Sequence, residues 1–123
     1  MRRMRWALFP AMVAVAALVV ATQVGAKPEA DPIKIGISLP LTGDFSEPGS
    51  AAQKGYIVWR DLMNKKGGLL GRKIELVIRD DRSDQNTIVS DYNGLITQDK
   101  VDLLLGTFSS LLNLPASAVA EKF

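Results

Sequence analysis

Alternating apolar residues mark the first predicted strand of the chain. Ile33, Ile35 and Ile37 recur at every second position and are followed by Leu39, which is the period of a buried β-strand. Pro40 ends this strand, and a polar loop over residues 41–48, with the sequence LTGDFSEP, follows it. A helical period begins after the loop, so this stretch predicts the first half of a βαβ unit.

The first helix is predicted from about Ser50 to Lys66. Ser50 or Gly49 is expected to cap its start, and Gly67-Gly68 is expected to end it. Tyr56 and Trp59 are interpreted as core residues, and Gly55 as a small residue that lets the helix lie close to the sheet. The apolar stripe that recurs at helical spacing comprises Ala52, Gly55, Tyr56, Trp59 and Met63.

A second strand and helix follow this pair. Residues 73–79, KIELVIR, alternate between apolar and polar positions and predict a strand. Asp84 is a suitable cap for a helix over residues 85–98, in which Gly94 is a mild weakness relative to alanine. The residues expected to face the core from this helix are Ile88, Tyr92, Leu95 and Ile96.

A third strand is predicted over residues 101–105, VDLLL, before a loop rich in glycine and hydroxyl groups. A last helical pattern begins at Leu111, with Pro115 expected in its opening turn. The side chains expected on the core face of this helix are Leu114, Ala118 and Val119.

The alternation of strands and helices predicts an α/β, Rossmann-like βαβαβα fold with a parallel sheet in the order 2-1-3 and right-handed crossovers. Ligands of such sheets bind outside the carboxyl ends of the strands, where the strand order reverses. That point lies between strands one and three, so we expect the loops over residues 41–48 and 107–113 to face each other there.

The N-terminus has the pattern of a cleavable signal peptide over residues 1–26. Arg2, Arg3 and Arg5 precede an apolar run from Trp6 to Ala21, and the small residues Val24-Gly25-Ala26 suit signal peptidase. An uncleaved membrane anchor is the alternative, but the run is shorter than the ~20 residues of a spanning helix. Residues 27–32, KPEADP, are expected to form a flexible tail before the domain over residues 33–123.

The amino-acid composition excludes several kinds of catalytic and metal site. The chain has no cysteine and no histidine, so the usual zinc sites, disulfides, thiol nucleophiles, lipid attachment at cysteine and Ser-His catalysis are all excluded. The basic residues of the predicted signal peptide account for the formal charge of +2 over the whole chain, which therefore does not indicate nucleic acid binding.

Motifs of the common α/β enzymes are also missing. The first strand–helix turn has no G-x-G-x-x-G, and the chain has no G-x-x-x-x-G-K-[ST], so dinucleotide and phosphate-loop sites are disfavoured. Asp80, Asp81 and Asp84 lack the spacing of a calcium loop. We interpret these three acids as strand-end solvation and helix capping, and expect neither a metal nor a cofactor.

Ser109 and Ser110 are the candidate binding residues that the pattern itself indicates. They lie between the carboxyl end of a strand and the N-terminus of a helix, where hydroxyls, free N–H groups and the positive helix end favour a small anion such as a carboxylate. The alternative is that Ser110 only caps the last helix, and spacing alone leaves both interpretations open.

Residues 33–123 resemble the N-terminal part of the leucine/isoleucine/valine-type periplasmic binding proteins, the type I solute receptors of ABC importers. The matching stretches are IKIGISLPLTG, MNKKGGLLGRKIELVIRDDRSD, LITQDKVDLLLGTFSS and PASAVAEKF. The resemblance implies a lobe of a two-lobed receptor that captures a solute without catalysis in the periplasm and delivers it to an ABC permease in the inner membrane.

The resemblance also implies a ligand site. Ser110 corresponds to a serine that hydrogen-bonds the α-carboxylate of an amino acid, and Phe45, Ser46 and Pro48 correspond to the cleft-lining first loop. The chain corresponds to about the opening third of such a receptor, so we expect no useful amino-acid affinity from it alone. A ligand-sensing lobe of a periplasmic regulator and a receptor for an amide or urea-like solute are the alternatives.

Overall fold

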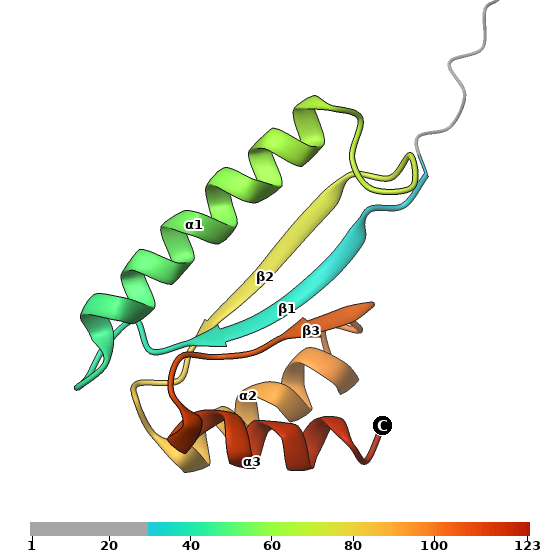
Figure 1. Ribbon diagram of the computed structural model, residues 1–123. Helices are drawn as coiled ribbons and strands as arrows, with labels where there is room; N and C mark the ends of the chain where they lie inside the picture. The colour runs from blue at the N-terminus through green and yellow to red at the C-terminus, as the bar shows by residue number, and fades with distance from the viewer. Residues whose placement is uncertain (1–29) are drawn as a thin grey trace, which may run out of the picture.

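The computed structural model describes residues 30–123, so the predicted signal peptide and the first half of the predicted tail lie outside it. Three parallel strands form one sheet in the order β2-β1-β3, as the sequence predicts. Helices and strands alternate along the chain (Figure 1): β1 (Ile33–Leu39), α1 (Ser46–Lys65), β2 (Ile74–Asp80), α2 (Gln85–Thr97), β3 (Leu103–Leu105) and α3 (Ser110–Ala120).

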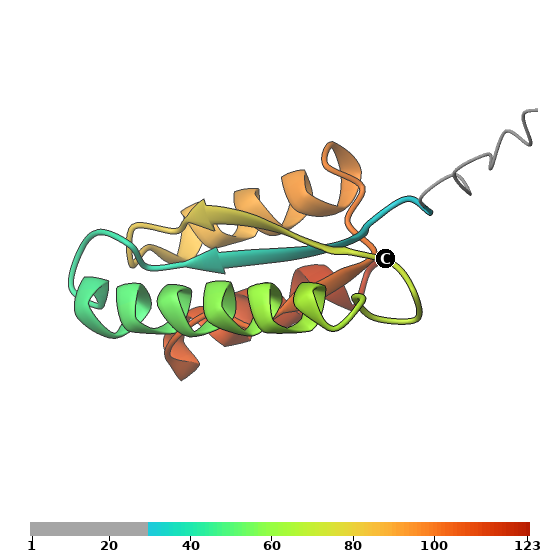
Figure 2. The same ribbon diagram turned by 90° about the horizontal axis from the view of Figure 1, so that it is seen from above.

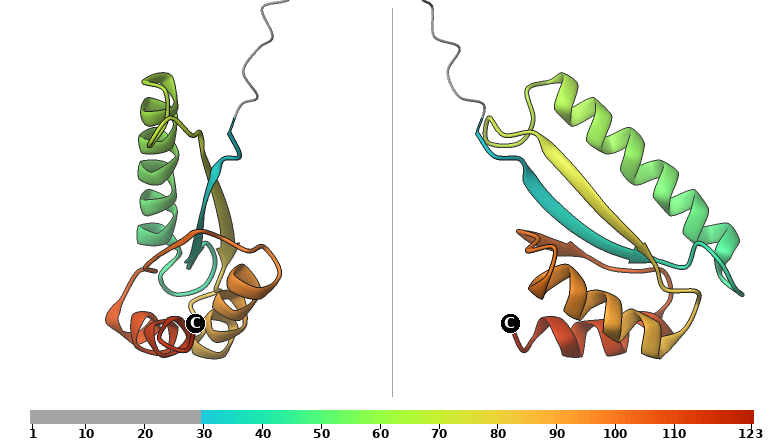
Figure 3. Two further views of the ribbon diagram at one scale, coloured as in Figure 1. Left: turned by 90° about the vertical axis from the view of Figure 1, so that its right-hand side faces the viewer. Right: turned by 180° about the vertical axis from the view of Figure 1, so that it is seen from behind.

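The sheet separates two apolar clusters. Helix α1 lies on one face, and α2 and α3 lie together on the other, as Figures 2 and 3 show from further directions. The alternation in β1 and β2 explains this division, because successive side chains of a strand point to opposite faces. On the α1 face the buried residues are Ile33, Ile35, Ile37, Leu39 and Ile74. On the other face they are Ile88, Tyr92, Leu95, Leu112, Ala116 and Val119.

Helix α1 begins at Ser46, earlier than predicted, so Pro48 and Gly49 lie in its first turn. The cap is Phe45, whose side chain accepts no hydrogen bond, and not Ser50 or Gly49. Contacts from elsewhere in the fold set this start: the Ser46 N–H donates to the Gly43 carbonyl oxygen at 3.1 Å, and the Phe45 N–H donates to Ser83 Oγ at 3.0 Å. Proline is compatible with a first turn because the N–H it lacks would have no helical partner there.

Two expectations about the apolar stripe of α1 are wrong. No atom lies within 4 Å of the position of a β-carbon at Gly55, so this glycine does not admit close packing on the sheet. Gly49 has that role, because a β-carbon there would run into the backbone carbonyl of Pro40. Trp59 is 37% exposed and lies at the margin of the fold, whereas Tyr56 packs against the apolar cluster as predicted.

Helix α2 has the predicted cap, since Asp84 Oδ1 accepts from the Thr87 N–H at 2.7 Å. Gly94 in this helix lies against the end of the Arg79 side chain. A β-carbon there would lie 2.5 Å from Nη1 of Arg79. The Arg79 guanidinium crosses α2 at this point and donates to Asp99 Oδ2 at 2.8 Å.

Helix α3 holds Pro115 in its second turn, not in its opening turn. The missing N–H of Pro115 leaves the carbonyl oxygen of Leu111 without its helical donor, and Gln85 Nε2 donates to that oxygen instead, at 3.3 Å. The predicted core face of α3 is also wrong in part. Leu114 is 76% exposed and Ala118 is exposed, whereas Leu112, Ala116 and Val119 form the buried face.

Strand β3 contains three residues and is shorter than predicted. Of the two residues before it, Val101 donates its N–H to the Leu95 carbonyl oxygen of α2, and Asp102 donates its N–H to the Lys34 carbonyl oxygen of β1. Among residues 30–123, no helix combines the length and apolar character that a membrane crossing requires.

Candidate functional site

The carboxyl ends of the three parallel strands meet at one rim of the sheet. Three loops, over residues 40–45, 81–84 and 106–109, leave the strands at this rim, and α1, α2 and α3 all begin there. Three positive helix ends therefore lie at the same edge of the fold, which is an environment that favours a bound anion.

Asp80, at the end of β2, fixes the first loop. Its carboxylate accepts from the N–H groups of Leu41 and Thr42 at 2.9 and 3.1 Å and from the Thr42 hydroxyl at 2.8 Å. It also accepts from the Arg82 N–H at 2.9 Å. Partial burial alone raises the pKa of Asp80, but these donors stabilise the charged form and together lower the pKa below its ordinary value.

Asp81 joins the second and third loops from a fully buried position. Its carboxylate accepts from the Ser83 N–H at 2.9 Å and from the Thr107 hydroxyl at 2.8 Å. Burial raises the pKa of Asp81 above its ordinary value, and the charges of Asp80 and Asp91 add to this rise. Asp81 is thus a buried carboxylate in the interior of the rim, and its interpretation as strand-end solvation is wrong.

Ser83 joins the second loop to the first. Its hydroxyl donates to the Thr42 carbonyl oxygen at 2.9 Å and accepts from the Phe45 N–H. The ring of Phe45 in turn lies against that of Phe108 in the third loop, with ring centroids 6.0 Å apart and an interplanar angle of 56°. The structure therefore brings the loops that follow β1 and β3 together, as the strand order predicts.

Ser109 is the residue that caps α3. Its hydroxyl accepts from the Leu112 N–H at 3.4 Å, and its backbone has a positive φ of 78°. Nδ2 of Asn113 holds this backbone in place by donating to the carbonyl oxygens of Thr107 and Ser109, both at 3.0 Å. A non-glycine residue with positive φ is uncommon and persists where surrounding contacts fix it.

Because Ser109 is the N-cap of α3, Ser110 does not cap the helix. It is the first residue of α3, its side chain is exposed, and its hydroxyl has no hydrogen-bond partner within residues 30–123. The backbone N–H groups of Ser110 and Leu111 also precede the first helical hydrogen bond of α3, which runs from Asn113 to Ser109. These groups can donate to an anion at the rim.

The other predicted site residues lie on the first turn of α1 and next to it. Phe45 is half-buried against Phe108, while Ser46 and Pro48 are half-buried at the start of the helix. The structure thus gathers all five candidates at one rim. Sequence reasoning did not identify the residues that position the loops, which are Thr42, Asp81, Thr107 and Asn113. The adjacent acids Asp80 and Asp81 were the one feature of the sequence that indicated polar contacts there.

This arrangement gathers hydroxyls, free backbone N–H groups and helix N-termini at the edge where open α/β sheets bind their ligands. A family model described as periplasmic binding protein matches residues 32–122. The chain therefore belongs to the periplasmic binding protein family, whose members bind solutes and are not enzymes.

Individual relatives agree with this family. Leu/Ile/Val-binding protein homolog 7 of Brucella abortus is 36% identical over 107 residues, which are 87% of this chain and 27% of that protein. The branched-chain amino acid transporter substrate binding protein LivJ of Streptococcus pneumoniae, solved in complex with isoleucine, is 35% identical with a TM-score of 0.72, covering 74% of this chain and 26% of LivJ. The leucine binding protein LivK of Thermotoga maritima is 29% identical with a TM-score of 0.67, covering 73% of this chain and 25% of LivK. The chain thus spans about a quarter of the length of these relatives.

Proposed function

We propose that the rim formed by residues 42–48 and 107–110 is one wall of an amino-acid-binding cleft. In this proposal the chain belongs to the substrate-binding component of an ABC importer for branched-chain or related amino acids, acts in the periplasm and delivers its solute to a permease in the inner membrane. The observation that carries the proposal is the free hydroxyl of Ser110 at the N-terminus of α3. The isoleucine complex of LivJ supports the choice of ligand class.

The chemistry at Ser110 suits a carboxylate. An O–H and two backbone N–H groups point from the positive end of α3, and the first turn of α1 adds a second positive end beside them. Hydrogen bonds to an ionised acceptor are stronger than those between neutral groups, so a carboxylate gains more here than a neutral solute would. Phe45 and Pro48 supply apolar surface on the same wall for the carbon atoms of the ligand.

Replacing Ser110 by alanine is expected to weaken amino-acid binding by about 1–3 kcal/mol, because a charged carboxylate loses a donor. The measurement is made in a chimera in which residues 33–123 replace the matching segment of Streptococcus pneumoniae LivJ. Isothermal calorimetry with isoleucine should then show a dissociation constant raised by roughly 5- to 150-fold.

Ser117 provides the matched control on the same helix. Its hydroxyl donates to the Leu114 carbonyl oxygen two turns from the rim, so Ser117→Ala should leave the isoleucine affinity unchanged. Equal dissociation constants for the parent chimera and Ser110→Ala would remove Ser110 from the site and with it the main support for the proposal.

The chain on its own is expected to bind no amino acid at useful affinity. Its described residues supply a single wall, and a ligand held from one side stays largely solvated, so too little surface is buried to offset the entropy of association. Calorimetry of the purified chain with leucine, isoleucine and valine should give no heat of binding at micromolar concentrations. A micromolar dissociation constant would contradict this expectation.

A further inference from the structure

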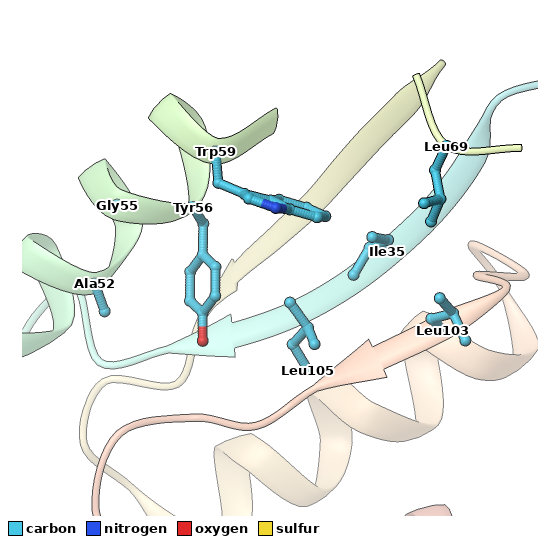
Figure 4. Close-up of a pocket in the computed structure, with 8 residues that line it drawn as sticks. All are labelled: Ile35, Ala52, Gly55, Tyr56, Trp59, Leu69, Leu103 and Leu105. Carbon is cyan, nitrogen blue, oxygen red and sulfur yellow. The ribbon is translucent and has the colours of Figure 1, made fainter. Parts of the chain in front are cut away.

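The polar groups that can orient a charged ligand lie at the rim and not in the open groove between α1 and β3. The walls of that groove are mostly apolar side chains, as Figure 4 shows, and they include Ile35, Leu103 and Leu105. A small-molecule site needs a few well-placed polar groups that fix the orientation of the ligand. The loop over residues 106–109 and the start of α3 carry such groups, so the contacts that hold this loop determine where its donors point.

Ser109, the last residue of this loop, has a backbone conformation that serine rarely adopts. Its φ is 78° and its ψ is 144°, close to a region of the Ramachandran map that is populated almost only by glycine. A serine at an N-cap ordinarily has a negative φ in the β region. The conformation of Ser109 is unfavourable by itself, so it persists only because surrounding contacts fix it.

The side-chain amide of Asn113 makes these contacts. Its Nδ2 donates to the carbonyl oxygens of Thr107 and Ser109, both at 3.0 Å, and the backbone N–H of Asn113 donates to the Ser109 oxygen at 3.1 Å. The other side of the amide lies over Gly106, where an added β-carbon would be 2.8 Å from Oδ1 of Asn113. Among residues 30–123, chain neighbours aside, only atoms of this amide lie within 4 Å of that position. The space at Gly106 is therefore the space that the Asn113 amide occupies.

Peptide planarity links these contacts to the binding groups at the rim. The Ser109 carbonyl and the Ser110 N–H belong to one planar trans peptide, so they point in opposite directions. Because Asn113 holds the carbonyl oxygen on the side of the helix, the Ser110 N–H is turned away from the helix. The Thr107 carbonyl and the Phe108 N–H are related in the same way, and neither N–H has an acceptor within residues 30–123.

We propose that Asn113 is the positioning residue of the carboxylate site and that Gly106 is the glycine that admits its amide. Asn113 fixes Ser109 as the N-cap of α3, which leaves the hydroxyl and the N–H of Ser110 to the ligand. Without the amide, Ser109 relaxes to the negative φ of an ordinary cap, and the Ser110 N–H turns with the peptide plane. This inference rests on the proposed amino-acid site at Ser110 and adds the residue that sets its geometry.

Asn113→Ala in the LivJ chimera should raise the dissociation constant for isoleucine by roughly three- to tenfold, the usual effect of a lost hydrogen bond. Gly106→Ala should have a similar effect, because the new β-carbon displaces the amide. Asn93→Ala is the matched control. Nδ2 of Asn93 donates to the Val89 carbonyl oxygen at 2.8 Å, also four residues back but within α2, so its loss should leave the isoleucine affinity unchanged.

Double-mutant cycles distinguish positioning from a general loss of stability. Gly106→Ala should have no further effect in the Asn113→Ala background, because the space at Gly106 is then free. Asn113→Ala should lose part of its effect in the Ser110→Ala background, since both changes act on the same donors. Additive effects in either cycle overturn the proposal. An Asn113→Ala chimera that binds isoleucine as tightly as the parent, when Ser110→Ala binds more weakly, overturns this inference alone.

NMR of the purified chain provides a second measurement that needs no ligand. The three-bond coupling between the amide and α protons of Ser109 reports its φ, and a φ of 78° gives a smaller coupling than the negative φ of an ordinary cap. Asn113→Ala should therefore raise this coupling, while Asn93→Ala should not change it. An unchanged coupling in Asn113→Ala overturns the positioning role. A raised coupling together with an Ser110→Ala chimera of unchanged isoleucine affinity instead contradicts the proposed ligand site and leaves the role of Asn113 in fixing Ser109.

Discussion

Replacing Gly49 by alanine is expected to destabilise the fold by about 3 kcal/mol, the upper end of the usual cost of overpacking. Gly49 is buried in the first turn of α1, and an added β-carbon meets the backbone carbonyl of Pro40, which is itself buried. A flexible side chain could move aside, but a backbone carbonyl at the end of β1 cannot move without shifting the strand. Urea unfolding of the purified chain should show this loss as a lower midpoint.

Gly55 in the same helix is the matched control. It is exposed, and no atom lies within 4 Å of the position of its missing β-carbon. Gly55→Ala should therefore raise the free energy of unfolding by about 0.5–1 kcal/mol, the usual difference between the two residues inside a helix. Equal effects of the two substitutions would show that helix propensity, and not the contact with Pro40, determines the result at Gly49.

The two glycines also show where sequence reasoning reached its limit. The period of the apolar residues identified the strands and the faces of β1 and β2, because alternation is a local signal. The alternation of strands and helices along the chain is typical of a parallel sheet, and the structure confirms the predicted 2-1-3 order. The start of α1 was misplaced because it depends on hydrogen bonds from Gly43 and Ser83. No pattern in the helix itself carries that information, so the tightly packed glycine was taken to be Gly55.

Helix α3 was misread for a similar reason. Its core face was assigned from Leu114, whereas packing against α2 turns Leu112 and Ala116 inward. Pro115 in the second turn is tolerated because Gln85, in another helix, supplies the missing donor to Leu111. The sequence left open whether Ser110 caps α3 or is available to bind a ligand. The answer depends on the positive φ of Ser109 and on the hydrogen bond that Asn113 donates to it, and no sequence pattern indicates either.

Asp81→Ala is expected to lower the free energy of unfolding by about 1–3 kcal/mol, whereas Asp81→Asn should preserve or raise it at pH 7. Alanine leaves the Ser83 N–H and the Thr107 hydroxyl without their acceptor in the interior. Asparagine can accept from Ser83 and donate to the Thr107 oxygen, and it removes a charge that burial disfavours. Urea unfolding of the three proteins at neutral pH makes this comparison.

The pH dependence of the free energy of unfolding distinguishes the effect of the Asp81 charge from the effect of its packing. The pKa of Asp81 is raised in the folded state, so between the unfolded value near 3.8 and that raised value the folded protein binds more protons. The contribution of Asp81 to stability therefore falls as pH rises through this window. Asp80, whose pKa is lowered, contributes in the opposite direction, so the informative quantity is the difference between wild type and Asp81→Asn.

That difference should grow in favour of Asp81→Asn as the pH rises from below 3.8 to neutral, and a difference independent of pH would contradict a buried charge at this position. The consequence reaches the candidate site, because Thr107 stands two residues before Ser109 and is held by Asp81. In the LivJ chimera, Asp81→Ala should weaken isoleucine binding while Asp81→Asn retains it. The Asp81 side chain is buried and accepts hydrogen bonds from Ser83 and Thr107, which both lie in loops of the rim. We therefore expect Asp81 to affect binding by holding the third loop, which leads to Ser110, in position.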